Sequence, residues 1–244
     1  RHKNVPANAV ASGNVTANGV DVSKARNGSI MMWLTDENNN GKLEVHIGQD
    51  GGVVANSNST GLFSVFNNVC YFDVTYLKTK NASSMKYMFS NACKNTTADF
   101  KIIGLDRWDV SNVTDFESMF SVAGYYSKNF DIGDLSNWNV SNALSMKKMF
   151  WETGSNANSI NLGDLSRWNV SNVTNMNNMF YALGSHNVYI GDISSWNVSN
   201  VTDMSQMFDF VRYLELDLSR WDVSKVTAYN SFSSDNIVQP HWVN

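Results

Sequence analysis

Two cysteines have the most specific chemistry of any residues in this chain. Cys70 and Cys93 each lie four positions after a phenylalanine, Phe66 and Phe89, so both are expected at one repeat position in adjacent units. Three arrangements are open: free buried thiols that behave as small apolar side chains, a disulfide, or part of a structural zinc site. Zinc prefers four ligands, and His46 is the nearby residue that could add one.

The run Asp36-x-Asn38-x-Asn40-Gly41 has the residue types of the first half of a calcium loop. Position twelve of such a loop needs a glutamate, and Ile47 stands there instead. Asn-Gly is also a strong signal for a tight hairpin turn. We therefore favour a hairpin in which the segments IMMWLTD and KLEVHIG pair as two strands.

The other residues that could act in catalysis do not suggest a site. The histidines share no motif: His2, His46, His186 and His241. Several aspartates recur with a sequence repeat: Asp134, Asp164 and Asp192. A carboxylate pair or a Ser-His-Asp triad needs unlike residues that converge once, whereas repeated residues predict a structural ladder. The chain is therefore expected not to be an enzyme and to need no cofactor, apart from the zinc considered above.

Composition restricts the function further. The chain has 244 residues, a formal net charge of −4 and 43% apolar residues, and its charged residues are scattered. Nucleic-acid binding normally requires a basic stripe, and attachment to anionic membranes requires one too. No run of about 18 apolar residues is present to span a bilayer. Any secretion signal or anchor is expected outside this segment.

A repeated phrase dominates much of the chain. Its tryptophans follow one another at steps of 30, 30, 28 and 25 positions: Trp108, Trp138, Trp168, Trp196 and Trp221. The copies are LDRWDVSNVTDFESMF, LSNWNVSNALSMKKMF, LSRWNVSNVTNMNNMF, ISSWNVSNVTDMSQMF and LSRWDVSKVTAYNSF. A weaker copy precedes them at 77–89, and in a still earlier one Phe66 is expected at the position of the final Phe.

Each repeat is expected to form a strand, a turn, a short helix and a loop. The segment Ile132–Val140 alternates apolar and polar residues, as a half-buried strand does. Phe116 and Met119 begin an apolar face at helical spacing, and Thr114 with Glu117 fits a capping box. The asparagines and serines of the phrase NVSNVT are expected to bond to turn backbone rather than to mark glycosylation.

One repeat cannot bury its own apolar face, so the repeats are expected to stack around a shared core. The recurring Trp, Met and Phe side chains would form ladders in this core; an exposed aromatic strip for sugars is the alternative, chiefly for the tryptophans. The fold class is α/β, a solenoid of strand–turn–short helix units with an N-terminal β-hairpin cap. We assign residues 1–28 to a linker or irregular lead-in, 29–55 to the hairpin cap and 56–244 to the repeat solenoid.

The phrase L-S-x-W-N-V-S-N-V-T-x-M-x-x-M-F resembles the repeat of BspA-like and Mycoplasma-lipoprotein-type bacterial surface proteins. The resemblance covers roughly Ser29 to Trp242. It implies a leucine-rich-repeat-like solenoid, attachment to the cell surface and a role in adhesion or host contact, and it implies no catalytic residues. The chain departs from the shortest family repeat by extra residues such as Gly124–Asp131, which leaves the conformation of that loop open.

These observations predict a non-enzymatic cell-surface or secreted binding module whose partner is an extracellular protein or glycan. Partner contact is expected in one row, formed by the variable residues that precede each tryptophan: Arg107, Asn137, Arg167, Ser195 and Arg220. The alternative is a structural subunit, or the outward-facing head of a surface appendage such as a type IV pilin.

Overall fold

The computed structural model describes residues 20–21, 31–36, 44–48, 53–64, 66–184, 186–233 and 236–242. The strands are β1 (Val20–Asp21), β2 (Met31–Thr35), β3 (Glu44–Gly48), β4 (Tyr71–Asp73), β5 (Phe100–Ile103), β6 (Phe130–Asp131), β7 (Ser159–Asn161), β8 (Asn187–Tyr189), β9 (Leu216–Asp217) and β10 (Ile237–Val238). Most of the expected lead-in at 1–28, the Asn40-Gly41 turn and most of the calcium-like run lie outside the described residues.

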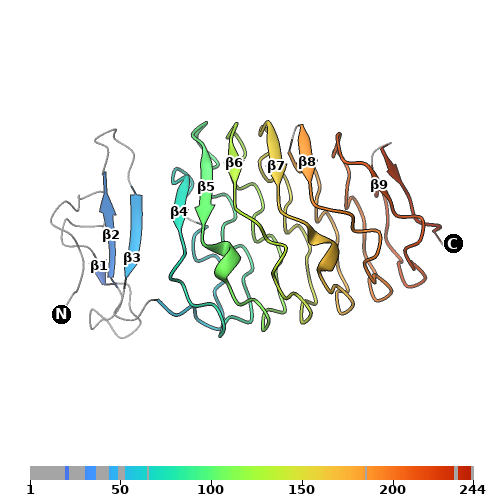
Figure 1. Cartoon of the computed structure of the whole chain (residues 1–244), viewed down its shortest axis with the longest axis horizontal. Helices are drawn as coiled ribbons and strands as arrows, with labels where there is room; N and C mark the ends of the chain where they lie inside the picture. Colours follow the sequence, from blue (N-terminus) through green and yellow to red (C-terminus); the bar gives the residue numbers. More distant parts are fainter. Residues whose placement is uncertain are drawn as a thin grey trace.

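A three-stranded antiparallel sheet, in the order β1-β2-β3, lies at the N-terminal end of the row of strands (Figure 1). β2 and β3 are the two strand-like segments expected to pair. The His46 ring stacks on Trp33 with centroids 5.5 Å apart, and its Nε2 lies 2.7 Å from Thr35 Oγ1. Ile47 packs against the core of the repeats, so this sheet meets the first repeat through β3.

Parallel pairing joins each later repeat to its neighbours. β4, β5 and β6 form one parallel sheet, β7 pairs with β8, and β9 pairs with β10. Isolated parallel bridges also connect seven residues, one from each repeat: Asn58, Ser84, Asp115, Ser145, Asn175, Asp203 and Ala228. Strands β4 to β9 stand in one row (Figure 1). We call residues 53–242 the repeat stack.

The prediction of a short α-helix in each repeat is wrong. The described residues contain two 3-10 helices, η1 (Leu105–Arg107) and η2 (Leu165–Arg167), and no other helix. None of the described helices has the length or apolar character to cross a membrane. The Met-x-x-Met-Phe segments, and the copy that begins with Phe116, form consecutive hydrogen-bonded turns. In that copy the Met119 N–H donates to Phe116 O (3.1 Å). We call residues 116–124 and their equivalents the turn ribbon.

Bonds between repeats explain why the turn ribbon is not helical. The Ser118 N–H donates to Lys147 O in the next repeat (2.8 Å), and Ser118 has a positive φ of 55°. An α-helix would need negative φ and would turn each N–H back to the residue four positions earlier. The neighbouring repeat satisfies these N–H groups. The apolar residues spaced three and four positions apart therefore lie on a backbone of successive turns and not on an α-helix.

The strand expected at Ile132–Val140 is also wrong. Strand β6 ends at Asp131, before that segment begins. Gly133 has a φ of 74°, and Asp134 Oδ1 accepts the Ser136 N–H (2.8 Å), so the backbone turns where an extended strand was expected. The apolar residues of the segment are nevertheless buried, which is why its alternating pattern suggested a strand.

Ladders of identical side chains fill the interior of the repeat stack. The five repeat tryptophans, here called the tryptophan ladder, are only 3–5% exposed. Neighbouring rings lie nearly parallel, with centroids 6.3–6.4 Å apart. A second ladder has centroids 5.3–5.7 Å apart and comprises Phe89, Phe120, Phe150, Phe180 and Phe208. The alternative of an exposed tryptophan strip for sugars is therefore wrong.

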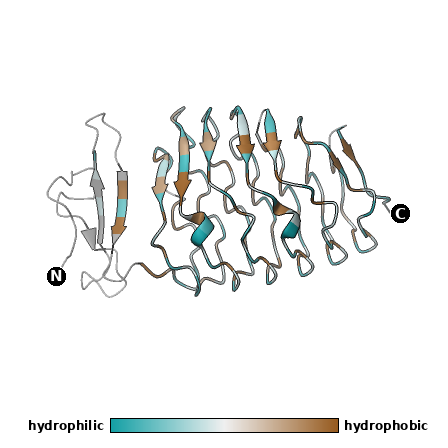
Figure 2. Cartoon of the chain, in the orientation of Figure 1, coloured by the Kyte–Doolittle hydropathy of each residue, from teal (hydrophilic) through white to brown (hydrophobic). Residues whose placement is uncertain are grey.

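Figure 2 shows the alternation of apolar and polar residues along the strands, most plainly along β5.

Phe63, rather than Phe66, occupies the final-Phe position of the first repeat. The Phe63 ring stacks on Phe89 with centroids 4.9 Å apart, and the Phe63 N–H donates to Met88 O (2.7 Å). At the other end of the stack, the Trp242 ring contacts two rings of the last repeat. The centroids lie 4.4 Å apart for Tyr229 and 4.9 Å apart for Phe232.

Candidate binding surface

The five residues expected to contact a partner occupy equivalent positions in successive repeats. Each is exposed and directly precedes a buried ring of the tryptophan ladder: Arg107, Asn137, Arg167, Ser195 and Arg220. We call them the pre-tryptophan row. Within the part of the chain that the structure describes, their side chains form no hydrogen bond or ion pair. The row is therefore not used to hold the repeats together.

The tryptophans hold this row in register. In every copy the indole Nε1–H donates to a backbone carbonyl of the preceding repeat, over 2.8–3.2 Å. Trp168, for example, donates to Leu135 O at 3.0 Å. Since each ring also stacks on its neighbours, the residues beside the rings must follow the same spacing. The structure thus places the five predicted residues side by side.

Aspartates flank the row on one side: Asp134, Asp164, Asp192 and Asp217. We call these four residues the aspartate ladder. Each accepts the N–H of the serine two positions later, at 2.8–3.0 Å. Hydrogen bonds from these serines lower the pKa of three of the carboxyls. At Asp164 and Asp192 the serine backbone N–H has the larger effect and the hydroxyl the smaller one, whereas at Asp217 the hydroxyl has the larger effect. The lowered pKa keeps the Asp164 and Asp217 carboxylates ionised at neutral pH, beside the guanidinium groups of Arg167 and Arg220.

Asparagines of the NVSNVT phrase flank the other side of the row. The first asparagine accepts a local N–H, as Asn169 Oδ1 does from Ser171 (3.2 Å). The second donates to the preceding repeat, as Asn172 does to Ser141 O (2.8 Å). The bond of the first asparagine is the turn bonding expected from the sequence, whereas the bond of the second joins two repeats. They form a fixed frame around the row.

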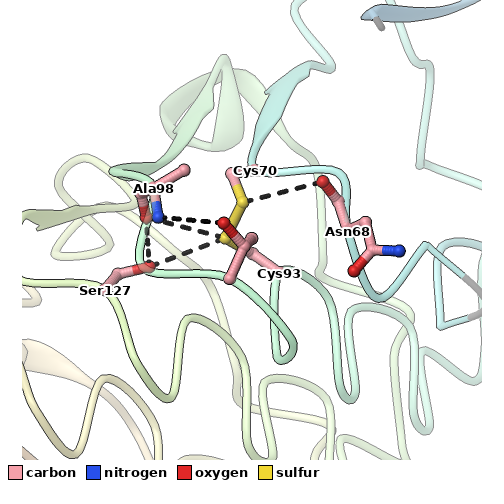
Figure 3. Close-up of a disulfide and its surroundings, with 6 residues drawn as sticks. Asn68, Cys70, Cys93, Ala98 and Ser127 are labelled. Carbon is pink, nitrogen blue, oxygen red and sulfur yellow. Dashed lines mark hydrogen bonds between the residues drawn. A yellow bond between two sulfur atoms is a disulfide. The ribbon is translucent and has the colours of Figure 1, made fainter. Parts of the chain in front are cut away.

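Cys70 and Cys93 form a disulfide, with Cα atoms 4.7 Å apart (Figure 3). Cys93 is fully buried, and the Ser127 hydroxyl lies 3.6 Å from its sulfur while donating to Ala98 O. Of the three arrangements that the sequence left open, the structure therefore has the disulfide. Sulfur atoms joined to each other are not thiolate ligands, so the zinc arrangement of these two cysteines does not fit. The described residues also contain no group of three or more His, Cys, Asp or Glu that could hold a metal ion.

The expected equivalence of the two cysteines is wrong. The Gly124 N–H donates to Ala92 O, the residue before Cys93, which makes Gly124 and Cys93 equivalent (2.9 Å). The Cys93 N–H donates in turn to Phe66 O, the residue before Asn67 (3.2 Å). Asn67 is therefore the equivalent of Cys93 in the first repeat, and Cys70 lies three positions beyond it, directly before β4.

A second group of surface residues was missed by the sequence reasoning. Trp151 stacks on Tyr181 (6.2 Å between centroids), which meets Phe210 edge-on (5.4 Å). We call these three residues the outer aromatic cluster. Lys148 Nζ lies 5.0 Å from the Trp151 ring centroid, and partial burial raises the pKa of Glu152 against the opposing effect of nearby lysines. Phe210 is 55% exposed.

The sequence did contain a signal for this cluster. In two earlier repeats the residue after the ladder phenylalanine is a serine, Ser90 or Ser121, whereas Trp151 and Tyr181 stand at that position in the next two. A large ring that replaces a serine is not required by the repeat. Comparing each copy with the others, rather than extracting only what they share, would have identified it.

Comparisons with known proteins identify a family but no characterised relative. The family model described as "Mycoplasma protein of unknown function, DUF285" matches residues 58–161 and 153–237. Neither the curated proteins nor the solved structures contain a significant match to the chain. The two matched segments cover most of the repeat stack.

Proposed function

The chain belongs to the DUF285 family, and from that premise we propose that it is a non-enzymatic binding module that contacts an extracellular protein or glycan through the pre-tryptophan row. The observation that supports this function is the contrast between the row and its surroundings. Tryptophans and asparagines beside the row bond to the preceding repeat, and aspartates beside it hold the local turns. The row residues vary between Arg, Asn and Ser, and the frame does not use their side chains.

The disulfide supports a location outside the cytoplasm. Disulfides form and persist in oxidising compartments, and cytoplasmic thiols are normally kept reduced. The Cys70–Cys93 bond joins residues 23 positions apart near the N-terminal end of the repeat stack. We infer that the chain is displayed at the cell surface or secreted.

The repeat architecture supports a binding role rather than a catalytic one. We infer that the stack is a leucine-rich-repeat-like solenoid of the BspA-like kind, because each repeat adds one turn of backbone and one member to each side-chain ladder. Such stacks present long, continuous surfaces on which a single row can contact an extended partner. Exposed arginines are well suited to this role, since Arg is among the residues enriched at binding hot spots.

The test is binding of the purified chain to an array of extracellular-matrix proteins and glycans. The triple substitution Arg107→Glu, Arg167→Glu and Arg220→Glu should weaken binding by on the order of a hundredfold, since each charge reversal removes about 1 kcal/mol. A matched control reverses three exposed lysines elsewhere: Lys80→Glu, Lys94→Glu and Lys128→Glu. The control has the same net charge and should retain binding.

Equal loss in both triple variants would show that net charge alone is responsible and would remove the row as the binding site. Absence of any array partner for the wild-type chain would count against the binding function itself. A hydrolase activity that specific substitutions abolish would contradict the non-enzymatic assignment.

A further inference from the structure

One repeat is shorter than the others. From the ladder phenylalanine to the next ladder tryptophan the chain advances 18 positions at Phe150–Trp168, 16 at Phe180–Trp196 and 13 at Phe208–Trp221. The last of these segments has too few residues to follow its neighbour along the whole of its path. β8 pairs with β7 and β9 pairs with β10, but β8 and β9, like β6 and β7, do not pair with each other.

A groove opens where this pairing is lost. It has a volume of about 430 Å³ and lies between the segments 188–194 and 214–217. Ile190 and Leu214 are buried at its base, and Val188 and Leu216 are partly buried against the core. A second hollow of about 390 Å³ shares the β9 residues and reaches Val238 on β10. Apolar surface is therefore accessible on both sides of β9.

The rim of the groove is acidic. Asp192, Glu215 and Asp217 are exposed there, and the described residues that line the groove include no lysine or arginine. Hydrogen bonds from Ser194 and Ser219 lower the pKa of Asp192 and Asp217, so both carboxyls are ionised at neutral pH. The groove thus combines apolar walls with a negatively charged edge.

We propose that this groove binds an extended peptide segment in which basic and apolar residues alternate. Unpaired strand edges offer backbone donors and acceptors to an added strand. The alternating side chains of such a strand point to opposite faces, so one set can enter the apolar hollows while the other meets the carboxylates. This inference rests on the proposed binding function and deepens it, because it names the chemistry of one partner segment.

A synthetic peptide of alternating lysine and valine is the probe, titrated calorimetrically into the whole chain. The double substitution Asp192→Asn and Asp217→Asn should weaken its binding about tenfold, from roughly 1 kcal/mol or less per charge. Asparagine keeps the local turn, as Asn169 shows with its bond from the Ser171 N–H. The matched control is Asp73→Asn with Asp134→Asn, which should leave affinity unchanged. Both residues lie away from the groove and accept the N–H of the residue two positions later, as Asp192 and Asp217 do.

Two further measurements locate the peptide and separate the two proposals. Bound peptide should slow amide exchange in segments 188–194 and 214–217 and not in the repeats before Asn161. A peptide of alternating glutamate and valine should not bind. Equal weakening by both double substitutions, or no protection at these segments, would overturn the groove assignment. If the lysine–valine peptide fails to bind while an array partner still binds through the pre-tryptophan row, only the groove proposal is lost.

Discussion

At the scale of single residues, each repeat tryptophan performs two structural tasks. Its ring extends a buried stack, and its indole N–H ties its own repeat to the carbonyl of the one before. A phenylalanine could supply the first contact but not the second. The requirement for both explains why the ladder is built of tryptophan, although the sequence alone indicated only a large buried ring.

Trp168→Phe should therefore destabilise the protein more than its loss of volume suggests. It removes the bond to Leu135 O (3.0 Å) and the outer part of a buried ring, and we expect the free energy of unfolding to fall by about 1–3 kcal/mol. Trp151→Phe, the same change in the outer aromatic cluster, should cost less than about 0.5 kcal/mol. Urea denaturation followed by circular dichroism measures both values. Equal losses would show that the indole bond contributes nothing.

At the scale of elements, the apolar pattern located the core but not the backbone. The buried positions Phe116, Met119 and Phe120 were identified correctly, yet their spacing suits a helix and a turn ribbon equally well. What separates the two is where the N–H groups bond, and the partner, such as Lys147, lies in a different repeat. Single-segment periodicity contains no information about that neighbour. The exposed, equivalent positions of the pre-tryptophan row could be predicted because they follow from the position beside a buried tryptophan, whereas the groove depends on which strands of neighbouring repeats pair.

Glycines in the connections after the strands show how tightly the elements pack, and Gly163 is the sharpest case. A Cβ at Gly163 (φ 85°) would collide with the carboxylate of Asp134, whereas one at Gly133 (φ 74°) would meet nothing within 4 Å. Gly133→Ala should therefore cost about 1 kcal/mol of stability from backbone strain alone. Gly163→Ala should cost roughly 2–4 kcal/mol because strain and collision add.

A double substitution isolates the collision. In an Asp134→Ala background, the additional cost of Gly163→Ala should fall toward that of Gly133→Ala, with the Leu135 backbone N at 3.2 Å as the remaining close atom. Chemical denaturation midpoints measure both costs. If the cost stays at its original value, the aspartate ladder does not pack on the glycine of the next repeat. The inter-repeat contact inferred from the geometry would then be wrong.

At the scale of the whole molecule, a stack of repeats is weakest at its ends, because each terminal repeat has one neighbour instead of two. Both ends carry additional contacts. β3 contacts β4 at the N-terminal side, and Trp242 lies on Tyr229 and Phe232 at the C-terminal side. The disulfide adds a covalent link within the first repeats, which precede Trp108, the first ring of the tryptophan ladder.

Reduction of Cys70–Cys93 should consequently loosen the first repeats and leave the central ones unchanged. Closing a loop between residues 23 positions apart restricts the unfolded chain and is worth about 3 kcal/mol. In a stack with nearest-neighbour coupling this effect is local. Amide exchange in segment 53–94 should accelerate on addition of reductant, while exchange around Trp168 should not change. The variant with Cys70→Ser and Cys93→Ser should exchange quickly in this segment with or without reductant. If reduction instead accelerates exchange along the entire stack, the molecule unfolds as one cooperative unit, and the disulfide contributes to the stability of every repeat.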